Sequence, residues 1–219
     1  MPVRIALVHA LAHSVAPIAA AFERLWPEAQ RMNLLDDSLS GDLARAGALD
    51  ARMTERFLAL AGYAIGTGAH GILFTCSAFG PCIDAVKQRW PDVPVLKPNE
   101  AMIDEATATG SRIGLVASFA PTLASMPAEF PPQVTLVPVL ADGALAALDR
   151  GDGAGHDRRV ADAAASIAAS CDAIALAQFS LARAASLVAQ RTGRPVLVTP
   201  DSAVRALRAR LHPAQQWNR

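Results

Sequence analysis

The 219-residue sequence predicts an α/β fold made of two similar lobes, each a parallel sheet flanked by helices. Short apolar runs alternate with longer amphipathic segments along the chain, as strands alternate with helices in such folds. The sequence also nearly repeats itself, because residues 4–8 read Arg-Ile-Ala-Leu-Val and residues 112–116 read Arg-Ile-Gly-Leu-Val. Two similar halves are expected to form two lobes with a ligand site in the cleft between them.

Two further blocks align between the halves. Residues 70–76 align with residues 172–178, and Pro94-Val-Leu aligns with Pro195-Val-Leu. Where the first of these blocks ends, the first half has Cys76 and the second half has Gln178. The repeat therefore supplies a thiol on one side of the expected cleft and an amide on the other.

Continuous apolar runs predict strands that are buried on both faces of a parallel sheet. The predicted strands cover residues 5–8, 32–35, 71–74, 93–96, 113–116, 134–137, 173–176 and 196–198. The predicted helices cover residues 15–26, 52–66, 80–90, 100–109, 157–170, 181–190 and 202–211. Proline and glycine punctuate several helix boundaries, and the glycine-rich residues 151–157 are expected to form a flexible surface loop. We expect residues 1–98 and 200–219 to form an N-terminal lobe and residues 99–199 a C-terminal lobe.

Composition excludes several classes of protein. Hydrophobic residues make up 52% and charged residues 18% of the chain, which is typical of a globular protein. Twenty basic and twenty acidic residues give a formal net charge of zero, so neither nucleic acid nor an anionic membrane is an expected partner. Three cysteines without paired spacing fit a reducing compartment, and we expect a cytoplasmic location. A homo-oligomer remains open, since dimers are the commonest assembly in general.

The apolar start of the chain could pass for a signal peptide. His9 and His13 interrupt that run, and the same motif recurs in mid-chain, so we interpret it as a buried strand. No segment reaches the roughly 18 uninterrupted apolar residues of a membrane span.

Parallel sheets bind ligands at the carboxyl ends of their strands, which in this chain are rich in hydroxyl, amide and small side chains. Phe74-Thr75-Cys76-Ser77 is the strongest candidate motif. A thiol at a strand-to-helix turn lies near helix N–H groups, which are expected to lower its pKa below the free value of about 8.5. Thr75 and Ser77 could bind a carboxylate or enolate oxygen, whereas the alternative is an inert, packed cysteine.

Other polar residues have two readings each. His9 and His13 could contact substrate or carry a proton, or could simply be hydrogen-bonded. Asp36 and its neighbours favour a helix cap over a substrate contact. Lys97 and Arg183 could pair with a substrate carboxylate or be solvated.

The other two cysteines, Cys82 and Cys171, are expected to be structural. No Cys/His spacing predicts a metal site, and no phosphate-loop or dinucleotide motif is present.

Taken together, these residues resemble the aspartate/glutamate/hydantoin racemase superfamily over almost the whole chain. The resemblance rests on three features in order: Phe74-Thr75-Cys76-Ser77, the segment 112–116 followed by Ser118 and Thr122, and Pro195-Val-Leu-Val before the last helix. It implies two pseudo-symmetric lobes and cofactor-free proton transfer at the α-carbon of a small carboxylate or hydantoin-like substrate. In that superfamily each lobe supplies a cysteine after a strand, and two thiols act on opposite faces of the substrate.

By this resemblance Cys76 is the first-half cysteine and acts as acid, base or nucleophile. The implied substrate-binding residues are Thr75, Ser77, Ser118, Thr122, Gln178, Phe179, Ser180, His13 and Ser14. The chain departs from the family pattern because Gln178 cannot act as a proton base. Three functions therefore stay open: an isomerase with an unusual second base, a single-cysteine decarboxylase or maleate-type cis-trans isomerase, and a non-catalytic small-molecule binding protein.

Overall fold

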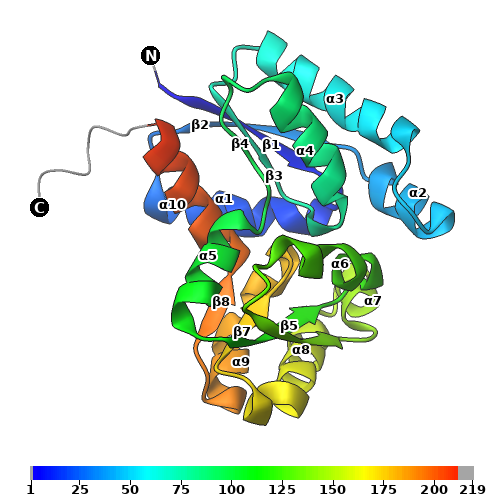
Figure 1. Cartoon of the computed structure of the whole chain (residues 1–219), viewed down its shortest axis with the longest axis vertical. Helices are drawn as coiled ribbons and strands as arrows, with labels where there is room; N and C mark the ends of the chain where they lie inside the picture. The colour runs from blue at the N-terminus through cyan, green and yellow to red at the C-terminus, as the bar shows by residue number, and fades with distance from the viewer. Residues whose placement is uncertain (1, 212–219) are drawn as a thin grey trace, which may run out of the picture.

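The computed structural model describes residues 2–211, so the predicted place of residues 212–219 in the first lobe lies outside the described residues. The chain forms two parallel four-stranded sheets flanked by helices, one above the other in Figure 1. The α/β fold of two sheet-based lobes, predicted from the alternating pattern and the repeat, is confirmed.

The two sheets have the same topology. The first has the order β2-β1-β3-β4 and the second the order β6-β5-β7-β8, and every pairing is parallel. The strands are β1 (Arg4–His9), β2 (Gln30–Leu35), β3 (Gly71–Phe74), β4 (Val95–Leu96), β5 (Arg112–Ala117), β6 (Thr135–Leu140), β7 (Ala173–Leu176) and β8 (Val196–Val198). The repeated Arg-Ile-x-Leu-Val motif forms β1 and β5, which hold the same place in their sheets, so the sequence repeat is a structural repeat.

Helices cover both faces of each sheet. Those that precede β5 are η1 (Ala12–Ser14), α1 (Val15–Leu25), α2 (Ser38–Ala46), α3 (Ala51–Gly66), η2 (Ser77–Phe79), α4 (Gly80–Arg89) and α5 (Glu100–Thr109). Those that follow are α6 (Ala120–Ser125), η3 (Met126–Glu129), α7 (Ala144–Asp149), α8 (Gly153–Ile167), η4 (Ala168–Ser170), η5 (Phe179–Ala184), α9 (Ala185–Thr192) and α10 (Thr199–Leu211).

Two sequence-based expectations about the elements are wrong, and three helices were missed. The segment 151–157 is not a surface loop throughout, because the Asp152 side chain accepts a hydrogen bond from Gly155 N (2.8 Å) and starts α8 at Gly153. The strands β2 and β6 are not buried on both faces, because they are edge strands with exposed positions such as Leu35 and Leu140. The helices α2, α6 and α7 were not predicted, since α6 and α7 have only six residues each and α2 is rich in serine and glycine.

The last helix returns to the first lobe. After β8 of the second sheet, α10 runs beside α1 toward the upper lobe in Figure 1. Its buried residues Ala203, Val204 and Leu207 join the core cluster that holds Ile5 and Leu7 of β1. The chain therefore passes between the lobes twice, once after β4 and once after β8.

A core glycine distinguishes β5 from β1, which has Ala6 at the corresponding place. A Cβ at Gly114 would lie 2.7 Å from Ile174 Cδ1, 2.9 Å from Ile167 Cδ1 and 3.1 Å from Cys171 Sγ. We expect Gly114→Ala to lower the free energy of unfolding by about 1–3 kcal/mol through overpacking, measured by urea denaturation. The control is Gly66→Ala, where no atom lies within 4 Å of the new methyl group. Equal stability of the two variants would contradict this account of β5.

Candidate functional site

Cys76 and Gln178 occupy equivalent places in the two lobes. Each lies two residues beyond the end of its strand, β3 or β7, and each begins a 3₁₀ turn. Their backbones are both extended, with φ −119° and ψ 119° at Cys76 and φ −141° and ψ 147° at Gln178. The predicted correspondence of thiol and amide therefore holds in three dimensions.

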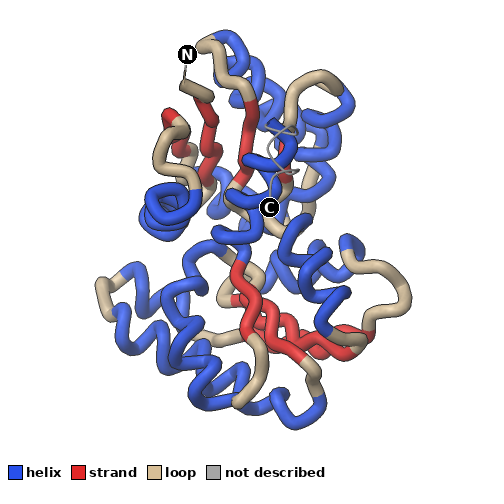
Figure 2. The backbone as a smooth tube through the Cα atoms, turned by 90° about the vertical axis from the view of Figure 1, so that its left-hand side faces the viewer, coloured by secondary structure: helices blue, strands red, loops and turns tan. Residues whose placement is uncertain are grey.

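The turns after β3 and β7 pack against the opposite lobe. The turn η2 contacts α6, and the turn η5 contacts η1, α1 and α10. Figure 2 shows the two sheets from the side, with helices and loops of both lobes meeting between them. At this junction Ser77 Oγ of the first lobe lies 3.1 Å from Thr122 Oγ1 of the second, and both residues are buried. The structure thus brings these two predicted substrate-binding residues together across the lobes.

The environment of Cys76 differs from the expectation in one respect. Burial raises the pKa of the Cys76 thiol to about 11, although the backbone N–H of Ala78 and the Ser40 hydroxyl act in the opposite direction. The expected lowering of this pKa by helix N–H groups is therefore wrong, because desolvation of the thiolate outweighs those hydrogen bonds. At neutral pH the residue is a protonated thiol, which suits a proton donor.

Thr75 and His9 form a buried hydrogen-bonded pair behind Cys76. His9 Nδ1 lies 2.8 Å from Thr75 Oγ1, and His9 Nε2 lies 3.0 Å from Asn33 Oδ1. Because the amide oxygen of Asn33 can only accept, we assign the proton to Nε2, which leaves Nδ1 to accept from Thr75. Burial lowers the pKa of His9, so its ring is neutral. Of the two readings of His9, this geometry favours a hydrogen-bonded core residue over a second base.

Gln178 is fixed by the second lobe. Its Oε1 accepts hydrogen bonds from Ser118 N (2.6 Å) and from Ser118 Oγ (3.2 Å). Its amide nitrogen has no hydrogen-bond partner among residues 2–211, so it is free to donate to a ligand. Gln178 and Ser118, both predicted to bind substrate, are thus in contact with each other.

The other predicted binding residues lie on the η1 and η5 side of the junction. His13 Nε2 contacts Asp149 Oδ1 at 2.7 Å, which links η1 to α7 across the lobes. Ser14 is buried at the end of η1, and Phe179 packs in the first-lobe core cluster. Ser180 is 2% exposed, and its Oγ has no partner in the described part of the chain.

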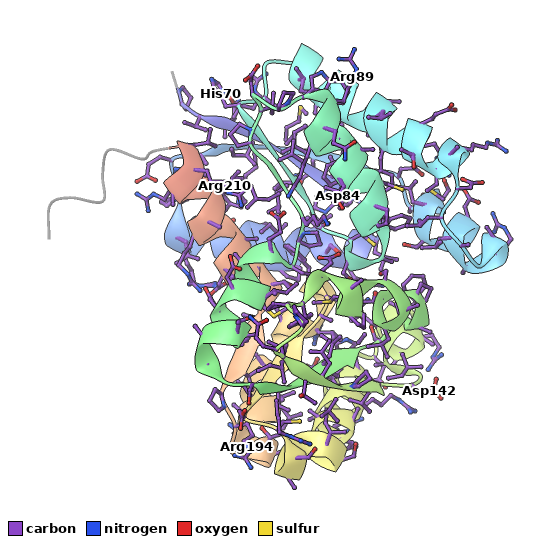
Figure 3. The ribbon with its side chains drawn as sticks, in the orientation of Figure 1. His70, Asp84, Arg89, Asp142, Arg194 and Arg210 are labelled. Carbon is purple, nitrogen blue, oxygen red and sulfur yellow. The ribbon has the colours of Figure 1, made fainter. Side chains whose placement is uncertain are left out.

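Each of the remaining charged candidates is paired with another residue of its own lobe. The Asp36 carboxylate accepts a hydrogen bond from Ser38 N (3.2 Å), the first residue of α2, which agrees with the helix-cap reading of this segment, although the N-cap residue itself is Asp37. Lys97 Nζ pairs with Asp84 Oδ2 at 2.7 Å, and Arg183 Nε with Asp157 Oδ1 at 2.8 Å. In Figure 3 the labelled Arg89, Asp142 and Arg194 lie at the periphery of the molecule, away from the lobe junction.

Sequence reasoning missed two residues next to the thiol and its neighbours. Ser40 hydrogen-bonds to Cys76 from α2, and Asn33 holds His9 from β2. Asn33 could have been found, because it is the one polar residue in the predicted strand 32–35. Ser40 could not, because α2 itself was not predicted.

Two cavities flank the lobe junction. The larger, of about 620 Å³, lies along α1 and is lined by residues of η1, η5 and α10. The smaller, of about 460 Å³, lies along α6 and is lined by Ala78, Ala120 and Ala124 among others. Neither is lined by Cys76 or Gln178.

Within residues 2–211, no cluster of three or more His, Cys, Asp or Glu side chains could hold a metal ion, and no helix could span a membrane.

Comparisons with known proteins identify the fold. No family model and no curated protein sequence matches the chain. Glutamate racemase from Francisella tularensis subsp. tularensis SCHU S4, in complex with D-glutamate, is similar with a TM-score of 0.76 and 14% identity, over 99% of this chain and 84% of that chain. Allantoin racemase from Klebsiella pneumoniae is similar with a TM-score of 0.73 and 18% identity, over 96% and 88% of the two chains.

A glycine-to-cysteine variant of arylmalonate decarboxylase, in a sulfate-associated form, is similar with a TM-score of 0.65 and 18% identity, over 99% of this chain and 96% of that chain. The chain thus has the two-lobe fold of these racemases and of arylmalonate decarboxylase, which is the fold that the sequence resemblance predicted.

Proposed function

We propose that this chain is a cofactor-independent enzyme that uses the thiol of Cys76 to transfer a proton at the α-carbon of a small carboxylate or related carbonyl compound. The observation that carries the proposal is the position of Cys76, at the turn after β3 where the two lobes meet. The fold shared with racemases of glutamate and allantoin supports the same reaction class.

The neighbouring side chains suit the charge that develops during such a reaction. Removal or addition of an α-proton passes through an enediolate, whose oxygens need hydrogen-bond donors that are already in place. The hydroxyl pair Ser77–Thr122 and the amide nitrogen of Gln178 are donors of this kind. In the protonation direction, the S–H bond of Cys76 breaks, a C–H bond forms, and solvent returns a proton to the thiolate.

The place of Gln178 favours a second candidate, a reaction that needs only one thiol. Ser118 holds Gln178 by two hydrogen bonds, and an amide does not exchange protons with carbon near neutral pH. A decarboxylation fits this arrangement, since the C–C bond breaks to release CO₂ and Cys76 protonates one face of the enediolate. A cis-trans isomerisation in which Cys76 adds to a double bond also needs one thiol.

Proton NMR in heavy water tests the proposal. Single enantiomers of amino acids and hydantoins, together with arylmalonates and maleate, are incubated with the wild-type chain and with Cys76→Ala. Deuterium uptake with inversion indicates an isomerase with a second base, whereas CO₂ loss or a change of double-bond geometry indicates the single-thiol reaction. Turnover that survives equally in Cys76→Ala would contradict both reactions.

The cytoplasmic location and the homo-oligomer stay predictions.

The raised pKa of Cys76 predicts how its reactivity depends on pH. A thiol with a pKa of about 11 is only about one part in ten thousand ionised at pH 7, so alkylation by iodoacetamide should be slow there. The rate should rise about tenfold per pH unit and level off near pH 11, because only the thiolate reacts. Peptide mapping by mass spectrometry separates Cys76 from Cys82 and Cys171, and the urea-unfolded chain serves as the control. A plateau below pH 9 would contradict the burial that we assign to this thiol.

A further inference from the structure

The cavity along α1 has a volume of about 620 Å³. Volumes of this size are typical of small-molecule sites. Most of its wall is formed by small apolar side chains of both lobes, namely Ala12, Ala16, Pro17, Ala20, Leu148, Ala182, Ala185, Val198 and Pro200. The polar lining residues are His13, Arg24, Ser180, Arg183 and Asp201.

The pseudo-symmetry of the fold provides an internal comparison for this cavity. Ser180 lies two residues after Gln178 and lines the α1 cavity, whereas Ala78 lies two residues after Cys76 and lines the α6 cavity. The α6 cavity has no charged lining residue. The α1 cavity therefore carries polar groups that its counterpart in the other half lacks.

Ser180 is the first sign of a ligand in the α1 cavity. Its side chain is 2% exposed, and its Oγ makes no hydrogen bond within residues 2–211. A buried hydroxyl without a partner costs about 1–3 kcal/mol, so such groups are normally satisfied by protein, water or ligand. A ligand oxygen in the cavity would satisfy it.

Arg183 is the second sign. Its Nε donates to Asp157 Oδ1 (2.8 Å), an oxygen that also contacts His156 Nδ1 (2.8 Å). Its two terminal nitrogens have no hydrogen-bond partner among the described residues. A Cβ on Gly153 would lie 2.3 Å from one of these nitrogens, so the absence of a side chain at Gly153 permits this position of the guanidinium.

The other charged or titratable residues that line the α1 cavity are already paired. Arg24 contacts Asp201 at 2.6 Å, and His13 contacts Asp149 at 2.7 Å. The groups left over are thus donors, the Ser180 hydroxyl and the terminal nitrogens of Arg183. Two such donors beside an apolar wall suit an anionic acceptor on an apolar body, and a guanidinium fits the geometry of a carboxylate.

We infer that the α1 cavity binds a small monocarboxylate with an apolar body, whose carboxylate is held by Ser180 and Arg183. This site is separate from Cys76, which does not line the cavity. Because both lobes form its wall, a bound ligand would also stabilise their relative position.

Calorimetric titration of the whole chain with 4-phenylbutyrate tests this inference, with the uncharged 4-phenyl-1-butanol and glutamate as comparisons. We expect saturable 1:1 binding of 4-phenylbutyrate and at least about tenfold weaker binding of the alcohol, which lacks the carboxylate, and of glutamate, which lacks the apolar body. No saturable binding of 4-phenylbutyrate, or equal binding of the alcohol, would overturn the inference.

Matched variants locate the site. Ala16→Leu fills the α1 cavity and Ala124→Leu fills the α6 cavity, and both alanines are exposed helical positions that tolerate leucine. Gly153→Ala displaces the flexible end of Arg183 without a core change. We expect Ala16→Leu and Gly153→Ala to weaken 4-phenylbutyrate binding about tenfold or more, and Ala124→Leu to leave it within about twofold. Equal loss in Ala16→Leu and Ala124→Leu would place the ligand elsewhere and refute the assignment.

Cys76→Ala separates this inference from the proposed function. The variant should bind 4-phenylbutyrate with wild-type affinity, even though it is expected to lose turnover. Loss of binding in Cys76→Ala would contradict a separate site, whereas absence of turnover in the wild-type chain would leave the binding result intact.

Discussion

Replacing Cys76 with alanine is expected to abolish turnover by the chain. The variant keeps the strand-to-turn geometry of β3 and η2, but it removes the S–H bond that we propose to supply the proton. Loss of a general acid typically lowers the rate by about 10²–10⁴-fold. Within the described chain, this turn has no other ionisable side chain that could take the place of the thiol. Rates of deuterium incorporation or product formation, measured at saturating substrate, provide the comparison.

The matched control is Cys82→Ala, six residues further along the same segment. Cys82 is buried in the core of the first lobe, where its sulfur lies 3.5 Å from Thr54 Oγ1. We expect the Cys82 variant to keep its activity and to lose only some stability. Inactivation by both substitutions would indicate a general structural effect, and activity in Cys76→Ala would refute the proposed role of the thiol.

Phe57→Ala is expected to produce the largest loss of stability. Phe57 is 1% exposed, and its ring lies 5.3 Å from that of Phe74 and 4.9 Å from that of Phe79, between centroids. These three rings pack behind the turn that carries Cys76. Removing a buried phenyl ring leaves a cavity and typically costs about 3–5 kcal/mol, which urea denaturation measures directly.

Tyr63→Ala on the same helix is the control for Phe57→Ala. The Tyr63 side chain is 62% exposed, so its removal should change the free energy of unfolding by no more than about 0.5 kcal/mol. If the two variants are equally stable, the ring cluster does not support the turn. If Phe57→Ala also speeds Cys76 alkylation, the cluster sets the burial of the thiol.

The sequence repeat was sufficient to predict the two lobes and the equivalence of Cys76 and Gln178. Both depend on strand-sized apolar runs, which survive in the sequence because strands of a parallel sheet are buried. The edge strands β2 and β6 deviated from this pattern only in exposure, which depends on strand order and not on local composition.

The protonation of the site was less predictable. A thiol at a helix start suggested a lowered pKa, but desolvation of the partly buried Cys76 beside α2 and the first-lobe core raises its pKa instead. The partners of Thr75 and Gln178 were also hidden, because His9 and Ser118 are 66 and 60 residues away in the chain. Contacts over such distances depend on strand order, which local sequence patterns do not specify.

The return of α10 to the first lobe has a consequence for how the chain folds during synthesis. Part of the apolar face of the first sheet, around Ile5 and Leu7, is covered by Ala203 and Leu207 near the end of the described chain. As the chain leaves the ribosome, α1 can cover this face early, but the part that α10 covers stays exposed while the whole second lobe is made. The second lobe has its own core clusters and can fold first, so the lobe made earliest is the last to be completed.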